Sequence, residues 1–193
     1  MKKADTLPVL SFVTQQDWEA WLEEHHADTR GIWLKIAKKE TGIPSVSYPE
    51  ALESALCYGW IDGQKASHDE QYWLQKFTQR SPKSIWSKVN CEKATALTAS
   101  GRMRPAGRRQ VELAKADGRW ETAYDSQSTS TIPDDFQQEL DANPQAKAFF
   151  QTLNRVNRYA ILFRIQTAKK PETRAARIQT FIDMLAKQQK LYP

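Results

Sequence analysis

The fold is decided by residues 60–78, which read WIDGQKASHDEQYWLQKFT. Two segments rich in aromatic and apolar residues, 60–64 and 72–78, lie on either side of the polar stretch 67–70. Runs of this kind, separated by polar turn residues, are typical of neighbouring strands in a β-hairpin. The sequence therefore predicts two antiparallel strands in this region.

The residues that precede the hairpin predict a third strand and two helices. Residues 32–38 alternate, with Ile32, Leu34 and Ile36 on one face, as expected for a strand that is buried on one side. A helix is expected from about Thr14, because a threonine caps the free amides of a first turn. Residues 47–50, SYPE, have the capping-box pattern and predict the start of a second helix. These helices are expected to cover the sheet.

The second half of the chain is predicted to be helical. No βαβ repeat and no glycine-rich phosphate loop occurs, which favours the α+β class. The expected fold is a small antiparallel sheet with covering helices, followed by a C-terminal helical unit. The expected organisation is an α+β unit over 1–124, a linker over 125–131 and a helical unit over 132–193. The predicted later helices cover residues 87–99, 106–117, 134–142, 145–153, 156–168 and 172–189.

Composition limits the class of protein. The chain has 193 residues, is 40% hydrophobic and contains 7 Trp, 7 Phe and 6 Tyr, which is ample for a core. The longest uninterrupted apolar run, 159–163, is far shorter than the roughly 20 residues of a membrane-spanning helix. Residues 1–8 supply no apolar export segment. Cys57 and Cys91 match no metal motif. We therefore expect a cytoplasmic protein with no membrane insertion, no metal and no cofactor.

The net charge of +5 conceals an alternation of charge along the chain. Acidic residues dominate 1–71 and 120–149, whereas basic residues dominate 72–119 and 150–193. The basic segments either form a surface for an anionic partner or pair with the acidic segments inside the molecule. The sequence leaves both alternatives open.

Five motifs, in order along the chain, carry a resemblance to a known family. They are residues 55–64 (ALCYGWIDGQ), 77–90 (FTQRSPKSIWSKVN), 101–107 (GRMRPAG), 118–120 (GRW) and 168–174 (AKKPETR). With these motifs the chain resembles the bacterial YdeI/OmpD-associated family, often labelled bacteriocin-protection. Gln79 departs from the proline expected at that position.

The resemblance implies a role more than a mechanism. The family has no established reaction, cofactor or catalytic residue, so none is carried over to this chain. Its label implies a link to tolerance of bacteriocins, other antimicrobials or envelope stress. Only the link to stress rests on this resemblance, whereas the expected non-catalytic ligand-binding or adaptor role rests on the aromatic and basic residues between Trp60 and Asn90.

The segment between Trp60 and Asn90 is the strongest candidate for a binding site. Aromatic faces hold flat groups, and guanidinium or ammonium groups neutralise anions, so the segment predicts a pocket for a small anionic ligand. In the structural alternative, Trp60 and Trp73 fill the core between sheet and helices, and Asp62 forms a salt bridge with Arg80 across the hairpin. The predicted ligand-binding residues are Trp60, Asp62, Arg80, Trp86, Lys88 and Asn90.

Nucleic-acid binding is the main alternative function. Basic and aromatic side chains interleave in this region, which permits base stacking together with phosphate contacts. Arginines between 102 and 109 extend the basic stretch. The residues considered for this surface are Lys76, Arg80, Lys83 and Lys88 with Trp73, Phe77 and Trp86, extended by Arg102, Arg104, Arg108 and Arg109.

Two further classes receive less support. His68 beside Asp69 has the composition of a general base, but such neighbours are common in turns, and no catalytic residue is predicted. An acidic protein partner is the other class, because the last helices are predicted to expose several arginines. Alternatively, the same arginines pair internally with the preceding acidic block. The arginines are Arg155, Arg158, Arg164, Arg174 and Arg177, and the acidic residues are Asp134, Asp135, Glu139 and Asp141.

Overall fold

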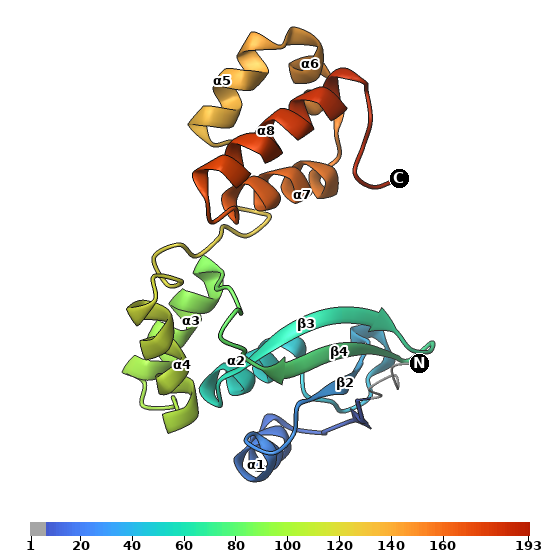
Figure 1. Ribbon diagram of the computed structural model, residues 1–193. Helices are drawn as coiled ribbons and strands as arrows, with labels where there is room; N and C mark the ends of the chain where they lie inside the picture. Colours follow the sequence, from blue (N-terminus) through green and yellow to red (C-terminus); the bar gives the residue numbers. More distant parts are fainter. Residues whose placement is uncertain (1–6) are drawn as a thin grey trace, which may run out of the picture. The chain divides into compact units, whose positions relative to one another are not determined.

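The predicted hairpin is present in the computed structural model, which describes residues 7–193 (Figure 1). Strand β3 (Trp60–Ser67) pairs antiparallel with β4 (Tyr72–Gln79). Strand β3 extends three residues beyond the predicted end at Gln64, because a bulge between Asp62 and Lys65 interrupts the ladder without ending it.

A mixed four-stranded sheet is built around this hairpin. Strand β2 (Gly31–Ala37) pairs antiparallel with β4, and the short β1 (Val9–Leu10) pairs parallel with β2, giving the order β1-β2-β4-β3. The α+β class is confirmed, and β1 makes the sheet mixed where an antiparallel sheet was expected. A strand of two residues is too short to show an alternating pattern of apolar and polar residues, so β1 could not be predicted from the sequence.

Helices α1 (Gln15–His25) and α2 (Tyr48–Cys57) accompany the sheet, and both begin with the predicted caps. The Asp17 amide donates to Thr14 Oγ1 at 3.1 Å, and Glu50 accepts from the Ser47 amide at 2.8 Å. The α1 side chains meet the sheet through aromatic contacts. The buried core of this layer contains Trp18, Leu22, Ile32, Leu34, Ile36, Leu56, Trp60 and Phe77.

Two more helices contact α2, the first through the salt bridge between Lys93 and Glu53 at 3.4 Å. They are α3 (Lys88–Ala99) and α4 (Pro105–Ala116). Between them, Arg102 donates to Glu19 Oε1 at 3.1 Å and to Glu53 Oε2 at 3.0 Å, which links the loop to α1 and α2. Gly107 of α4 lies directly against the carbonyl end of α2.

The chain divides into two compact units. The first runs to Trp86 and resumes from Asn90 to Thr122, and the second contains Ser87–Val89 and Ala123–Pro193. The boundaries inferred from the sequence stay a prediction. Residues 1–6, which contributed to the inference that no export segment is present, lie outside the described residues. Over residues 7–193, no helix is both long and apolar enough to cross a membrane.

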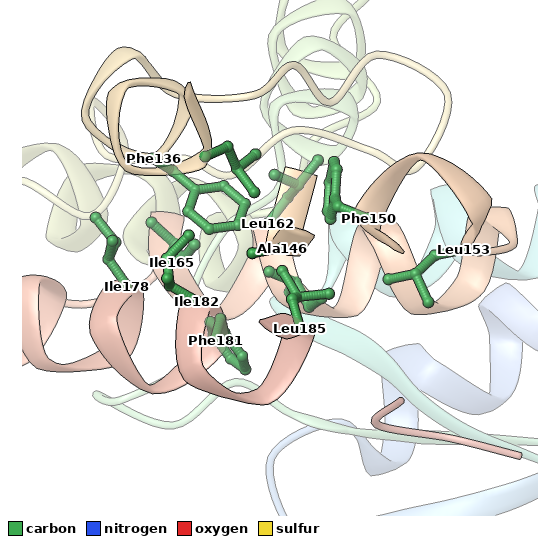
Figure 2. Close-up of a cluster of buried hydrophobic side chains, with 12 residues drawn as sticks. Phe136, Ala146, Phe150, Leu153, Leu162, Ile165, Ile178, Phe181, Ile182 and Leu185 are labelled. Atoms are coloured by element: carbon green, nitrogen blue, oxygen red, sulfur yellow. The ribbon is translucent and has the colours of Figure 1, made fainter. Parts of the chain in front are cut away.

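The second unit is the predicted group of helices. It contains α5 (Asp134–Ala142), α6 (Pro144–Thr152), α7 (Arg155–Gln166) and α8 (Pro171–Ala186). Figure 2 shows side chains from all four helices meeting in one apolar cluster. The members of this cluster are Phe136, Leu140, Ala146, Phe150, Leu153, Ile161, Leu162, Ile165, Ile178, Phe181, Ile182 and Leu185.

Internal pairing accounts for part of the arginine-rich surface of this unit. Arg174 binds Asp135 through two hydrogen bonds, Nε to Oδ2 at 2.6 Å and Nη2 to Oδ1 at 2.8 Å. Arg177 donates to the Arg164 carbonyl, and Arg164 donates to the Ala160 carbonyl at 3.0 Å. The internal alternative is thus confirmed for the Arg174–Asp135 pair, while an acidic protein partner stays a prediction.

The close approach of α4 to α2 predicts the effect of adding one methyl group. In a Gly107→Ala variant the new Cβ would overlap the Cys57 carbonyl oxygen and lie 2.7 Å from that of Leu56. We expect the free energy of unfolding to fall by about 2–3 kcal/mol in urea denaturation. Gly63→Ala is the matched control, because its new Cβ would meet only the Lys76 side chain, at 3.7 Å. Equal stability of the two variants would contradict this packing.

The Arg174–Asp135 pair predicts a pH dependence of stability. The hydrogen bond from Arg174 lowers the pKa of Asp135, so the pair stabilises the fold above the unfolded pKa of about 3.9. That contribution is lost as the pH falls through the lowered pKa. Asp135→Asn should cost about 0.5 kcal/mol at pH 7, the value of a partly exposed pair, and less near pH 3, which is below the unfolded pKa. Urea midpoints at both pH values measure this.

Asp134→Asn is the control for this measurement. Asp134 lies in the same first turn of α5, so any general effect of a charge at the helix start applies to both residues. If the two variants lose equal stability at pH 7, the specific contribution of the pair is refuted.

Candidate ligand-binding groove

The structure places Trp60 in the core between the sheet and α1. Its side chain is 0% exposed, and its indole Nε1 donates to the His26 carbonyl at 3.0 Å. Its ring meets Trp18 and Trp21 edge to face, at centroid distances of 6.3 and 5.9 Å. Trp60 therefore has the role assigned to it by the structural alternative, with no ring face available to a ligand.

Arg80 and Trp86 are brought together, as the pocket hypothesis expected. The Arg80 guanidinium carbon lies 3.5 Å from the Trp86 ring centroid, and Nη1 donates to the Ile85 carbonyl at 3.3 Å. The other ring neighbour of Trp86 is Trp120, at 5.0 Å. Arg80 is 5% exposed and Trp86 is 2% exposed, so this stack is part of the interior.

The three remaining predicted residues lie in separate environments. Asp62 accepts a hydrogen bond from the Tyr48 hydroxyl at 2.9 Å. Asn90 is buried in α3. Lys88 belongs to the second unit, where it pairs with Asp125 at 2.7 Å. Ligand binding by the six predicted residues stays a prediction.

The predicted chemistry, cationic side chains beside an aromatic ring, occurs instead at the Ser67–Tyr72 end of the hairpin. Here a groove of about 590 Å³ runs between β3, β4 and the residues that follow β2. Lys65 Nζ lies 4.3 Å from the centroid of the Trp73 ring. We call this the Trp73 groove, and its lining residues are Lys38, Lys39, Glu40, Lys65, Ala66, Ser67 and Trp73.

The bulge in β3 places Lys65 on the Trp73 side of the sheet. Up to Asp62, which pairs with Phe77, the ladder is regular, and without a bulge Lys65 would pair with Leu74. The inserted residue makes Lys65 pair with Gln75 instead. A shift of one residue moves a side chain to the opposite face of a sheet. Lys65 therefore faces the helices, on the same side as Trp73.

The bulge is held by a buried side chain. Gln75 Nε2 donates to the Gly63 carbonyl at 2.9 Å and to the Gln64 carbonyl at 3.3 Å. These carbonyls belong to the two residues that the bulge removes from the regular ladder, so the amide replaces hydrogen bonds that the backbone lacks there. A buried Gln on a central strand is thus explained.

Neighbouring contacts fix the other parts of the groove. Tyr48 packs against Trp73 at a centroid distance of 6.1 Å, and its hydroxyl is held by Asp62. The Lys38 amide donates to the Gln71 carbonyl at 2.8 Å, which ties the start of the 3-10 turn η1 (Lys39–Thr41) to the beginning of β4. Three lysines and one glutamate give the rim a positive balance.

Neither of the two cysteines considered for catalysis is activated. Burial raises the pKa of Cys57 to about 11 and that of Cys91 to about 11, so both remain thiols at neutral pH. His68 Nε2 lies 3.7 Å from Asp69 Oδ2, while Asp69 Oδ1 accepts from the amides of Gln71 and Tyr72. Asp69 thereby closes the hairpin turn. No group of three His, Cys, Asp or Glu residues suited to a metal occurs in residues 7–193.

Sequence reasoning considered Trp73 but missed Lys38, Lys39 and Lys65. The signal that could have found Lys65 is Gly63, because an isolated glycine within a strand pattern indicates a bulge. Lys38 and Lys39 carry no comparable signal. Their position depends on a backbone hydrogen bond to Gln71, a residue more than thirty positions away.

The Arg80–Trp86 stack predicts a structural role for Arg80. Arg80→Ala removes the cation–π contact and the packing of the side-chain stem, so we expect a loss of about 2 kcal/mol in urea denaturation. Arg108→Ala is the control, because Arg108 is exposed on α4. Unchanged stability of Arg80→Ala, relative to Arg108→Ala, would show that Arg80 is not a strut.

Comparison with known families divides the chain into two matched stretches. Residues 10–110 match the family described as "Domain of unknown function (DUF8412)", and residues 129–188 match "Bacteriocin-protection, YdeI or OmpD-Associated". The second match confirms the resemblance inferred from the sequence, and of the motifs that carried it, only 168–174 lies within this stretch. No curated protein and no solved structure matched the chain. The chain belongs to the DUF8412 family of unknown function, which covers residues 10–110, and its residues 129–188 match the YdeI or OmpD-associated bacteriocin-protection family.

Proposed function

We propose that the first unit is a non-catalytic binding module that holds a small anionic ligand with a planar group in the Trp73 groove. The observation that carries the proposal is the Lys65–Trp73 contact inside a groove of about 590 Å³. That volume is within the range of about 300–1,000 Å³ that is usual for ligand sites. The proposal keeps the ligand class predicted from the sequence and moves it to other residues.

A planar group of a ligand can replace the Lys65 ammonium on the face of the Trp73 ring. A cation–π contact at an exposed site contributes only about 0.5–1 kcal/mol, so a planar group can displace the Lys65 ammonium from the ring. The displaced ammonium, together with Lys38 and Lys39, is then available to a phosphate or carboxylate as a charge-assisted donor. Glu40 repels further negative charge, which favours a ligand with one compact anionic group.

The cellular role proposed for this binding is tolerance of antimicrobial or envelope stress. Support comes from the description of the family matched by residues 129–188, "Bacteriocin-protection, YdeI or OmpD-Associated". We further propose that the protein acts in the cytoplasm. Loss of tolerance in cells that carry only a groove variant would connect the binding to the phenotype.

Adenosine monophosphate and phenyl phosphate are suitable probes, because each joins one planar group to one phosphate. We expect both to bind with dissociation constants of about 0.1–1 mM in isothermal titration calorimetry, a range appropriate to one stacking contact and one charged contact. Lys65→Gln should weaken both about five- to tenfold, since it removes one charge-assisted hydrogen bond. Adenosine and inorganic phosphate alone should bind more weakly than either probe.

Lys115→Gln is the matched control for this titration. Lys115 also lies over a tryptophan, Trp120, at 5.2 Å, but it is on α4 and outside the groove. We expect its affinity for both probes to equal that of the unmodified protein. Absence of binding of both probes, or an equal loss in the two variants, would refute the Trp73 groove as the site.

A further inference from the structure

The side of the sheet opposite α1 and α2 carries a second arrangement of lysines and aromatic rings. Trp33 and Lys35 of β2 alternate with the buried Ile32, Leu34 and Ile36 and so face away from the core. The register pairs Trp33 with Lys76 and Lys35 with Leu74, which places these β4 residues on that same face. We call Trp33, Lys35, Tyr72, Leu74 and Lys76 the outer sheet face.

Each lysine of the outer sheet face lies over a ring. Lys35 Nζ is 4.4 Å from the Tyr72 centroid, and Lys76 Nζ is 5.9 Å from the Trp33 centroid. All four side chains are half-buried, so neither the rings nor the ammonium groups are enclosed. The strands therefore present two cation–aromatic pairs that remain accessible within the first unit.

The charged side chains that the strands place on this face are all lysines. Strands β2 and β4 contain no acidic residue, and the acidic residue of β3, Asp62, is bonded to Tyr48 on the helix side of the sheet. The carboxylate of Asp69, in the hairpin turn, interacts electrostatically with Lys35, whereas no carboxylate of the described strands faces Lys76. This face fits a partner that carries repeated negative charge and flat groups.

We propose that the outer sheet face binds single-stranded nucleic acid, with bases stacked on Trp33 and Tyr72 and phosphates bound by Lys35 and Lys76. Trp33 is opposite Lys76, and Tyr72 is four residues from Lys76 along β4. At about 3.3 Å per residue, the two rings are therefore separated by about 13 Å along the strand direction. This spacing suits bases of different nucleotides along one strand.

The physical argument favours a single strand over a duplex or an acidic protein. A base must be unstacked before it can lie on an aromatic side chain, which a duplex does not permit without deformation. Stacking on a ring is favourable for every base, whereas an acidic peptide would use the lysines and leave both rings without a partner. Because base stacking is stronger than an exposed cation–π contact, a strand can displace the lysines from the rings.

This inference goes beyond the proposed function, because it rests on different side chains on the opposite face of the sheet. The test uses the full chain and fluorescein-labelled dT12 and rU12, with anisotropy measured from 25 to 200 mM salt. We expect micromolar binding at low salt that weakens as salt rises. In Lys35→Gln/Lys76→Gln, the slope of log K against log salt should shrink by about 1.4, because each lost single-strand phosphate contact removes about 0.7.

Two further variants separate charge from stacking. Lys169→Gln/Lys170→Gln removes the same charge from exposed positions just before α8, outside every surface considered for nucleic acid, and should leave affinity and slope unchanged. Tyr72→Leu should weaken binding about five- to twentyfold while leaving the slope unchanged, since a ring contributes stacking and no phosphate contact. Circular dichroism of every variant confirms that the sheet is intact.

Three outcomes would overturn the inference. They are no binding at 25 mM salt, an equal change of slope in the two double variants, and loss of oligonucleotide binding in Lys65→Gln with none in Lys35→Gln/Lys76→Gln. The last outcome would place the strand in the Trp73 groove. Conversely, oligonucleotide binding without any binding of adenosine monophosphate or phenyl phosphate supports the outer sheet face and refutes the Trp73 groove.

Discussion

The Gln75 side chain holds the bulge in β3, and the chemistry of the Trp73 groove depends on that one contact. Its amide donates to the carbonyls of Gly63 and Gln64, where the regular ladder is interrupted. The resulting shift of one residue places Lys65 on the face of Trp73. An unbulged strand would place Lys65 beside Leu74, on the opposite face of the sheet, and Trp73 would lack its cation.

The same register places different side chains on the two faces of the sheet. On the side that faces the helices, Trp60 and Phe77 are fully buried beneath α1, and the groove lies next to this core, beside Trp73. On the other face, Lys35 and Lys76 cover accessible rings with no strand carboxylate beside them. Both faces therefore combine aromatic surface with positive charge, one as a concave groove and one as an open platform. This division is the basis of the two proposals, a compact ligand in the groove and an extended one on the open face.

Much of the fold followed from local patterns, whereas the site depended on contacts between distant residues. The alternation of Ile32, Leu34 and Ile36 and the Ser47–Glu50 cap were sufficient to predict β2 and the start of α2. The segment 60–90 led us to expect Arg80 near Trp86, but it did not show that the two side chains stack in the interior. The groove lysines could not be grouped in advance, since a bulge and the Lys38–Gln71 hydrogen bond bring them together.

Nuclear Overhauser contacts across the hairpin measure the register directly. The account predicts that Lys65 shows backbone contacts to Gln75, that its Hε protons contact the Trp73 indole, and that the ring shifts these protons upfield. Substitution of Gln75 by Leu should weaken all three signals, because the bulge loses the amide that bridges its carbonyls. Backbone and side-chain contacts from Lys65 to Leu74, without contacts to the Trp73 indole, would show a regular strand and would contradict the account.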